Sequence, residues 1–276
     1  MESRYLPDCD RYVRLSTDEL RAGYLVQNLF QPGAAKLVYT DVDRAIVGGV
    51  VPTAQKLSLG TSKELASTYF AERRELGVIN IGGKGSVTVD GKECSLEKRD
   101  CLYIGRGNQK IEFASADAKM PAWFYIVSYP AHAAHPTRLV TPKDAEPVNL
   151  GSQQDANQRT IYKYIHLNGI KSCQLVMGFT ELKEGSVWNS MPPHTHTRRT
   201  EVYLYFDLAP EAAVFHFMGT AEQTRHLVIR NGEAVLSPPW SLHCGAGTRN
   251  YSFIWAMGGE NQEFTDMDQI AVKDLK

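Results

Sequence analysis

Residues 193–201 read Pro-His-Thr-His-Thr-Arg-Arg-Thr-Glu, and this run says more about the fold than any other part of the chain. Side chains alternate between the two faces of a β-strand, so His194 and His196 point the same way if the run is a strand. Glu201, five residues further on, can join the same face after a short irregular stretch. Two imidazoles and a carboxylate on one face of a strand predict a metal site in a β-rich fold.

A fourth candidate ligand, His243, follows a turn-rich segment and residues 238–240, Pro-Pro-Trp. Three imidazoles and one carboxylate suit Zn²⁺, and they also suit Fe²⁺, Mn²⁺ or Ni²⁺. The chain has 8 histidines, so a lone His-x-His would mean little. The added Glu201 and His243 make metal binding the favoured interpretation, with coordination positions left open for a substrate oxygen.

The charge and composition exclude several functional classes. Lys and Arg number 30 and Asp and Glu 31, so the net charge of −1 gives no basic excess for binding nucleic acid. No run of residues approaches the length of a membrane span, and the first ten residues lack the apolar core of a signal peptide. Five scattered cysteines without a Cys-x-x-Cys indicate reduced thiols. We therefore expect a cytoplasmic protein with neither nucleic acid nor a membrane as partner.

Most of the chain has the pattern of β-strands, with short runs rich in Val, Ile, Tyr and Phe between turn residues. Few helices are expected: one over residues 17–29, capped by Ser16 or Thr17, and a second short one over residues 62–71. Regularly spaced strands with so little helix predict an all-β sandwich or barrel. The clearest expected strands are residues 76–81, 85–89, 123–127, 160–165, 174–179, 202–206, 213–217 and 251–256.

The chain divides into two halves with a similar rhythm. Asp90-Gly91 precedes residues 98–105 in the first half, as Asn231-Gly232 precedes residues 234–239 in the second. Each reads as a hairpin followed by a strand that enters a tight loop. The first half offers no His-x-His. We therefore expect two related β-barrels, an N-terminal one without metal ligands and a C-terminal metal-binding one, with a linker between them; the boundaries are 1–130, 131–158 for the linker, and 159–276.

The two runs that carry the ligands resemble the two sequence motifs of the cupins. Residues 194–201, His-x-His-x4-Glu, are similar to the first motif. Residues 232–250, Gly-x5-Pro-x4-His-x6-Asn, are similar to the second. Alone, these motifs indicate only a metal-binding cupin, a superfamily with many chemistries.

Further segments make the resemblance more specific, and it covers essentially the full chain: residues 178–189, 191–196, 201–206 and 238–243, with 70–77 and 99–105 in the first half. Together they resemble the 5-keto-4-deoxyuronate isomerase family, the 4-deoxy-L-threo-5-hexosulose-uronate ketol-isomerases of pectin breakdown. One departure from the general cupin pattern is Gly185, a turn glycine that lies further than usual from the first histidine.

This resemblance implies a bicupin of two jelly-roll barrels that assembles as a homo-hexamer and holds one Zn²⁺ per chain. It implies a metal-dependent aldose–ketose isomerase of pectin and uronate catabolism, with a small keto-uronate as its partner. The expected reaction converts 5-keto-4-deoxyuronate to 3-deoxy-D-glycero-2,5-hexodiulosonate. A divalent cation would polarise the carbonyl in such a reaction, and Zn²⁺ has no redox role, which fits an isomerisation.

The reaction also needs a group that moves a proton. Glu201 is one catalytic candidate, although a carboxylate is a weaker base when it binds a metal. Tyr203 is the second, because Tyr203 and Tyr205 share the strand parity of Glu201 and would face the same interior. Packing in the barrel core is the alternative role for both tyrosines. Glu181 and Glu184 are further possible bases.

The carboxylate expected on the substrate requires a cationic partner. Arg198 and Arg199 lie within the metal-binding run, and we expect one of them to face the site. Arg159 and Lys163, on the strand that opens the second barrel, are alternatives. We take Arg159, Arg198 and Lys163 as the candidates for substrate binding, with an exposed surface position as the alternative for each.

Two other functions stay open from the sequence. An iron-dependent cupin dioxygenase would use the same four ligands, and metal analysis with an oxygen-uptake assay separates it from an isomerase. A non-catalytic sugar-binding cupin would normally be joined to a DNA-binding segment, but residues 1–43 hold one candidate helix and no recognisable helix-turn-helix. The identity of the base, and the choice between proton and hydride transfer, also stay open.

Overall fold

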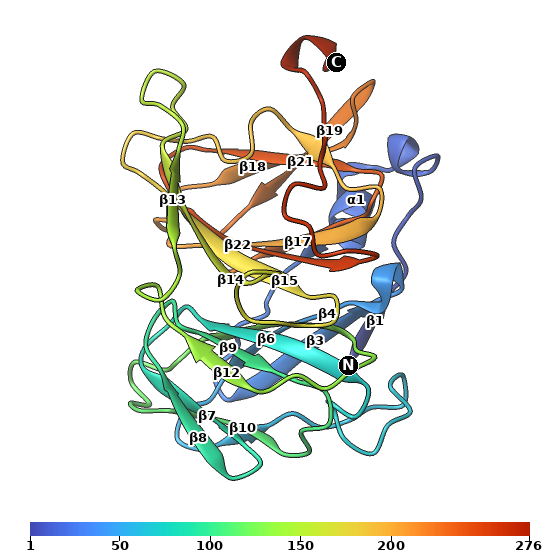
Figure 1. The fold of residues 1–276 in the computed structure, drawn as a ribbon. Helices are drawn as coiled ribbons and strands as arrows, with labels where there is room; N and C mark the ends of the chain where they lie inside the picture. The colour runs from blue at the N-terminus through green and yellow to red at the C-terminus, as the bar shows by residue number, and fades with distance from the viewer. The chain divides into compact units, whose positions relative to one another are not determined.

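The computed structural model describes residues 1–276, which form two compact units built almost wholly from strands (Figure 1). This confirms the expected all-β class of two jelly-roll barrels with few short helices. None of the helices is both long and apolar enough to cross a lipid bilayer. The first unit comprises residues 1–4, 28–146 and 164–176, and the second unit comprises residues 5–27, 147–163 and 177–276.

The first unit contains a seven-stranded sheet and a four-stranded sheet. The larger sheet has the strand order β1-β3-β4-β11-β6-β9-β12, and the smaller has the order β5-β10-β7-β8. Figure 1 shows β7, β8 and β10 side by side in the smaller sheet. The bounds are β1 Glu2–Arg4, β3 Ala34–Thr40, β4 Ile46–Val51, β5 Leu57–Ser58, β6 Arg74–Asn80, β7 Gly85–Val89, β8 Lys92–Leu96, β9 Cys101–Ile104, β10 Ile111–Ser115, β11 Phe124–Pro130 and β12 Arg138–Val140.

The core of the first unit is apolar and lies between these two sheets. Strand β7 shows why, because buried Val87 and Val89 alternate with polar residues on its other face. They belong to one hydrophobic cluster with Leu76 and Val78 of β6 and Phe113 of β10. The side chains that β6 directs into the core of this unit are therefore aliphatic.

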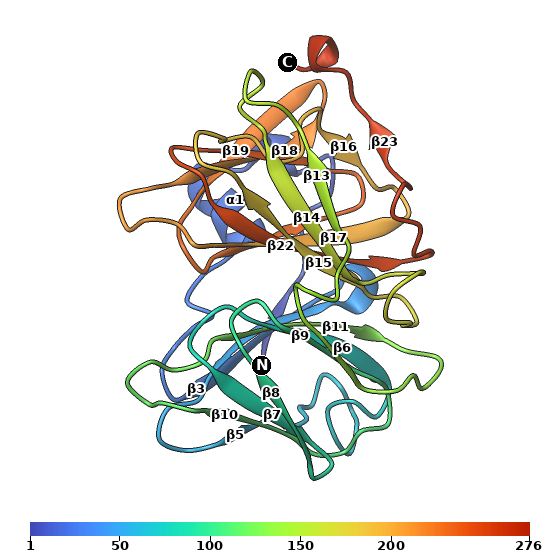
Figure 2. The same ribbon diagram turned by 60° about the vertical axis from the view of Figure 1, so that its left-hand side comes forward.

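The second unit also contains two sheets, with the orders β13-β14-β15-β22-β17-β20-β2 and β19-β18-β21-β16-β23. Figure 2 shows β14, β15, β17 and β22 together, and β16 beside β23. The bounds are β2 Leu25–Val26, β13 Pro147–Leu150, β14 Arg159–Ile165, β15 Val176–Leu182, β16 His194–Thr195, β17 Arg199–Phe206, β18 Val214–Thr220, β19 Gln223–Ile229, β20 Ala234–Ser237, β21 Leu242–Gly247, β22 Ser252–Gly259 and β23 Asp268–Gln269.

Helical structure is confined to α1 (Thr17–Tyr24) and three 3₁₀ turns. Ser16 caps α1 in a capping box with Glu19, as the sequence pattern predicts. The helix ends earlier than expected because Leu25 is extended and begins β2. The second expected helix, over residues 62–71, is wrong: that segment forms turns and bends. The 3₁₀ turns are η1 Tyr12–Arg14, η2 Val42–Arg44 and η3 Val272–Asp274.

The boundaries of the two units differ from those expected from the sequence. Residues 5–27 belong to the second unit, because α1 leads into β2, where Leu25 pairs with Val235 of β20. Residues 131–146 belong to the first unit and are not a linker, because β12 pairs with β9. Strand pairing, which composition does not reveal, sets both boundaries.

Candidate metal centre

Three strands of the second unit position the four predicted ligands. His194 lies on β16 and His243 on β21, and these two residues are paired directly across the antiparallel strands. Glu201 is the third residue of β17. His196 lies in the turn between β16 and β17, where its carbonyl accepts a hydrogen bond from the backbone N–H of Arg199. The turn, and not continued strand alternation, brings His196 to the site.

The four side chains converge on one point. His194 Nε2 lies 3.1 Å from His196 Nε2 and 3.2 Å from His243 Nε2. Glu201 Oε2 lies 3.0 Å from His196 Nε2 and 2.7 Å from His243 Nε2. All four ligand atoms lie within 4.8 Å of one another, and all four residues are buried. The group could therefore hold a metal ion.

The protonation states fit a metal-ligand role, since ligand imidazoles must be neutral and carboxylates ionised. Burial, helped by His243, lowers the pKa of His194 from 6.5 to about 2, so this imidazole is neutral at pH 7. Burial opposes ionisation of Glu201. Its close contacts with His243 and His196 outweigh it, so the pKa of Glu201 lies well below its ordinary value.

Backbone groups fix the orientation of two of the imidazoles. His196 Nδ1 lies 2.6 Å from the carbonyl oxygen of Asp266, and His243 Nδ1 lies 3.3 Å from that of Ser241. A proton on Nδ1 donates to such a carbonyl and leaves the lone pair of Nε2 directed into the site. Arg199 supports the same loop, because its Nη2 donates to the Asp266 carbonyl at 2.8 Å.

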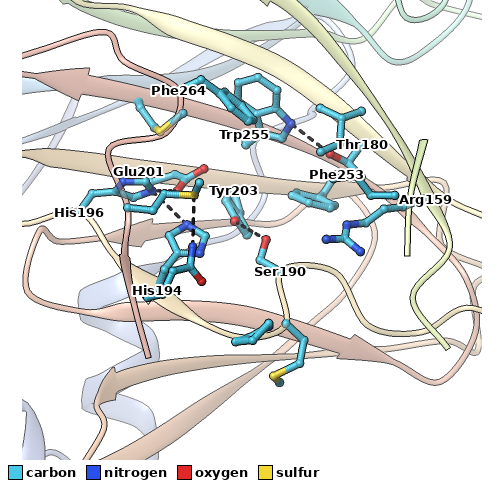
Figure 3. A pocket seen from close by; sticks show the side chains of 17 residues that line it. Arg159, Thr180, Ser190, His194, His196, Glu201, Tyr203, Phe253, Trp255 and Phe264 are labelled. Carbon is cyan, nitrogen blue, oxygen red and sulfur yellow. Dashed lines mark hydrogen bonds and ion pairs between the residues drawn. The ribbon is translucent and has the colours of Figure 1, made fainter. Parts of the chain in front are cut away.

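A cavity of about 220 Å³ adjoins three of the four candidate ligands. His194, His196 and Glu201 form one side of it, and Figure 3 shows Arg159 on the opposite side with Tyr203 and Ser190 between. Three apolar residues of β22 form a wall of the same cavity: Phe253, Trp255 and Met257. The site is thus polar at two ends and apolar along one wall.

Two of the sequence candidates line this cavity as well as the ligands. The Tyr203 hydroxyl lies 3.1 Å from Ser190 Oγ, and burial together with the Glu201 charge raises its pKa well above 10. Arg159 is half-buried, and its Nη1 donates to the Asn157 carbonyl at 2.9 Å. Both side chains present polar hydrogen atoms to the cavity. Tyr205 lies deeper, with its hydroxyl 2.7 Å from His216 Nδ1.

The other cationic candidates do not line the cavity. Arg198 is held by Asp266 and Asp268 in ion pairs. Arg199 is fully buried, and its Nη1 donates to the Glu263 carbonyl at 2.7 Å. We expected Arg198 or Arg199 to face the site; both instead hold the segment that follows β22.

Lys163 also lies outside the lining of the cavity. Its Nζ lies 4.7 Å from the centre of the Phe264 ring, and it is Phe264, not Lys163, that lines the cavity. Lys163 can therefore act on a ligand only through that ring. The candidate base Glu181 is likewise outside the lining of the cavity, and its Oε2 lies 3.8 Å from Lys183 Nζ in an ion pair.

Sequence reasoning missed most of the apolar lining. Phe253, Trp255 and Met257 alternate with Ile254 and Ala256, so residues 253–257 are all apolar and the alternation of faces gives no signal. The segment with Phe264, Met267 and Gln269 also escaped notice, because it has neither a motif nor a strand-like pattern. The candidate metal ligands could be predicted from their spacing in the sequence. The apolar residues that line the cavity could be identified only from the three-dimensional structure.

Comparisons with known proteins agree with this architecture. A protein of Shouchella clausii named 4-deoxy-L-threo-5-hexosulose-uronate ketol-isomerase is 53% identical over 276 residues, covering 100% of both chains. A protein of Halalkalibacterium halodurans with the same name has the same identity and coverage. The crystal structure of an IolB-like protein from Salmonella typhimurium shares the fold, with a TM-score of 0.73 at 14% identity over 90% of this chain and 96% of that one.

These relatives confirm the resemblance expected from the sequence and its enzyme class, since a ketol-isomerase is an intramolecular oxidoreductase. The model of the KduI/IolB family matches residues 25–275, nearly the whole chain. The chain belongs to the KduI/IolB family.

Proposed function

We propose that this protein is a metal-dependent aldose–ketose isomerase that converts 4-deoxy-L-threo-5-hexosulose uronate to 3-deoxy-D-glycero-2,5-hexodiulosonate in the catabolism of pectin-derived uronates. The full-length relatives at 53% identity that bear this ketol-isomerase name carry the proposal. The convergence of three buried imidazoles and a carboxylate beside a cavity supports it, because such a site suits an isomerisation that needs a Lewis acid.

We propose one Zn²⁺ per chain, held by His194, His196, Glu201 and His243. When bound, such a cation would polarise the substrate carbonyl and lower the cost of negative charge on the substrate oxygens. Three nitrogen donors and one oxygen donor match the ligands that zinc prefers. Zinc without oxygen uptake would separate this function from that of an iron-dependent dioxygenase.

Two residues are proposed to manage the proton that moves from C2 to C1. The Tyr203 hydroxyl lies in the cavity beside Ser190 and keeps its proton, so it can donate a hydrogen bond to a substrate oxygen. Glu201 is the carboxylate nearest to that hydroxyl along the strand, and it is the proposed proton acceptor. Both act on the side of the cavity that holds the imidazoles (Figure 3).

Arg159 is proposed to bind the substrate carboxylate at the other end of the cavity. A guanidinium binds a carboxylate through charge-assisted hydrogen bonds, and the one protein acceptor of Arg159 is a neutral carbonyl. The substrate's carbon 4 carries no hydroxyl group and lies between these two ends. A hydroxyl there would face the apolar side chains of Phe253, Trp255 and Met257 along that wall. The apolar wall therefore favours a 4-deoxy substrate.

The same proposal includes a homo-hexamer, as the resemblance implied. It also includes a cytoplasmic location without a nucleic-acid or membrane partner, as the composition and charge suggested. The first test is direct observation of the carbonyl migration by proton NMR, with the keto-uronate prepared from an unsaturated uronate digest. Metal content measured on the same sample should show one zinc per chain. If the purified, zinc-loaded protein left the keto-uronate unchanged, the proposed function would be wrong.

A run in D₂O tests the chemistry of the transfer. Proton transfer through a solvent-exchangeable group should place deuterium on the product carbon. Complete retention of the substrate hydrogen would instead support a hydride shift or a shielded base. A hydride shift would remove the proposed role of Glu201 as proton acceptor, whereas a shielded base would not, and the isomerase activity would stand in both cases.

A further inference from the structure

The first unit contains a second cavity, of about 240 Å³, that has no role in the proposed reaction. All of its lining residues belong to the first unit. Three of them are the arginines Arg44, Arg73 and Arg74, and one is the phenol Tyr39. Only one acidic side chain, Glu64, lines the same cavity. The balance of charge around the cavity is therefore positive.

The strand pairings place Arg74, which lines this cavity, two residues before the position that a candidate metal ligand occupies in the second unit. Strand β6 lies between β11 and β9 in its sheet, as β17 lies between β22 and β20. Leu76 pairs with the last residue of β9, and Glu201 pairs with the last residue of β20. Leu76 thus corresponds to the metal-ligand candidate Glu201, and Arg74 corresponds to Arg199.

Arg74 is a buried cation without an acidic partner. Its exposed fraction is 6%, and its hydrogen bonds go to neutral groups only. Nε donates to Ser128 Oγ at 3.1 Å, and Nη2 donates to the carbonyls of Ser128 and Arg44. No protein group accepts from Nη1. Burial lowers the pKa of Arg74 to about 10, so the guanidinium stays charged at pH 7.

A buried charge is costly unless an opposite charge compensates it. In the second unit the corresponding Arg199 has acidic neighbours, because Glu201 and Asp266 act on its charge. Around Arg74 the groups with such an effect are two tyrosines, Tyr39 and Tyr129, and no carboxylate. The missing negative charge must come from outside the chain if it is to come at all.

The loop that carries Arg44 is strained in a way that supports a binding role. Asp43 and Arg44 both have positive φ, 47° and 52°, a region that residues other than glycine rarely adopt. This conformation directs the Arg44 carbonyl to Arg74 Nη2. Strain of this kind concentrates at ligand-binding segments, because the surrounding structure must hold it in place.

We propose that the first unit binds a small organic anion in this cavity, with the Arg74 guanidinium as the central contact and Arg44 and Arg73 at the rim. Phe70, Leu65 and Pro130 line the remaining wall and suit a carbon skeleton. A carboxylate and a phosphate share the head-group chemistry that arginines recognise. A sugar acid or a sugar phosphate of this size would fill the site, which is separate from the metal centre.

Titration of the zinc-loaded protein with D-galacturonate, glucose 6-phosphate and inorganic phosphate at low salt tests the proposal. We expect one of the two organic anions to bind with saturable heat in calorimetry and to raise the melting temperature. Tighter binding of D-galacturonate would identify a carboxylate as the preferred anionic group, and tighter binding of glucose 6-phosphate would identify a phosphate. Binding of inorganic phosphate with equal affinity would overturn the role of the apolar wall, and no binding in any arm would overturn the site itself.

Variants locate the binding. Arg44→Ala/Arg73→Ala should weaken it about tenfold or more, since each lost charge-assisted bond has a large effect. Arg14→Ala/Arg249→Ala removes the same charge from exposed positions of the second unit and should leave the affinity unchanged. Equal weakening in both double variants would mean that only overall charge matters, which contradicts a built site.

Two further variants separate this cavity from the metal centre and from folding effects. Arg74→Met should abolish binding and should not lower the melting temperature in the absence of anion, because a buried unpaired charge has been removed. His243→Ala disables the metal centre and should leave the anion affinity intact. Loss of binding in His243→Ala, with retention in Arg74→Met, would assign the anion to the metal centre and end the proposal.

Discussion

Strands β6 and β17 occupy corresponding positions in the sheets of their two units, but their inward-facing side chains differ. In the first unit Leu76 and Val78 belong to a continuous apolar cluster. At the corresponding positions of the second unit stand Glu201 and Tyr203, which line the cavity beside the metal centre. One barrel architecture thus carries an aliphatic core in one unit and a buried polar site in the other. The difference teaches that a polar site needs only a few inward positions of a strand, provided that each polar atom has a partner.

The largest expected effect follows from removal of a ligand in the second unit. His243→Ala leaves three donors around the site, and loss of a direct ligand should exceed the roughly 10- to 100-fold loss in metal affinity typical of outer-shell changes. We expect isomerase activity to fall below detection, together with the zinc content measured by elemental analysis. His226→Ala, an exposed histidine of the same unit, is the matched control and should keep both. Full zinc content and activity in His243→Ala would contradict the assignment of the site.

Substitutions at the two corresponding positions, Leu76 and Glu201, compare what each side chain contributes to stability. Leu76 is fully buried in the first unit, so Leu76→Ala should lower the free energy of unfolding by about 2–5 kcal/mol. Glu201→Leu in metal-free protein should lower it by less than Leu76→Ala does, because the added apolar side chain partly offsets the lost contacts of the ionised carboxylate with His196 and His243, and it should abolish activity. Urea unfolding of both variants gives the comparison. A larger stability loss in Glu201→Leu than in Leu76→Ala would mean that the carboxylate has a mainly structural role.

A smaller effect is expected at Tyr203, whose counterpart in the first unit is an aliphatic core residue. Tyr203→Phe keeps the ring contacts but removes the hydroxyl that lies beside Ser190 in the cavity. If this hydroxyl helps to move the proton, kcat should fall by roughly 10- to 100-fold, at the low end for such groups. Zinc content should not change. An unaltered kcat would return Tyr203 to a packing role, as Val78 has in the first unit.

The sequence predicted the convergence of the four candidate ligands better than their surroundings, for physical reasons. Histidine and glutamate are rare in barrel interiors, so His194, His196 and Glu201 are conspicuous at their spacing. The motif could not reveal that His196 reaches the site from a turn or that Arg199 supports the loop behind it. Whether Arg198 or Arg199 faces the cavity depends on how the segment after β22 packs against them, and no local sequence pattern predicts that packing.

The boundaries of the units show the same limit. Composition placed a break near residue 130, but residues 5–27 join the second unit through the pairing of β2 with β20. Two residues, Leu25 and Val26, form that strand, and so short an apolar run has no distinctive pattern. The arginine-lined cavity of the first unit escaped prediction as well, since its residues come from four separate segments of the chain.

The smallest expected effect is a pH dependence that should distinguish the two units. His216 is fully buried in the second unit with its Nδ1 2.7 Å from the Tyr205 hydroxyl, whereas the core cluster of the first unit contains no histidine. Burial, with a contribution from His243, lowers the pKa of His216 from 6.5 to about 3. Between these two values the unfolded chain binds a proton at this residue that the folded chain does not.

Stability from neutral His216 is therefore fully present above pH 6.5 and is lost as the pH falls towards 3, by up to about 1.4 kcal/mol per pH unit. His216→Gln cannot be protonated, so the free energy of unfolding of the metal-free variant should fall less steeply with acid. Urea unfolding at pH 7, 6, 5 and 4 measures the slope. The exposed His226→Gln is the control and should keep the wild-type slope, because its imidazole meets water in both states. Equal slopes in all three proteins would show that the buried imidazole gains a compensating partner in acid, and the acid sensitivity of the second unit would then have to come from its metal-binding residues.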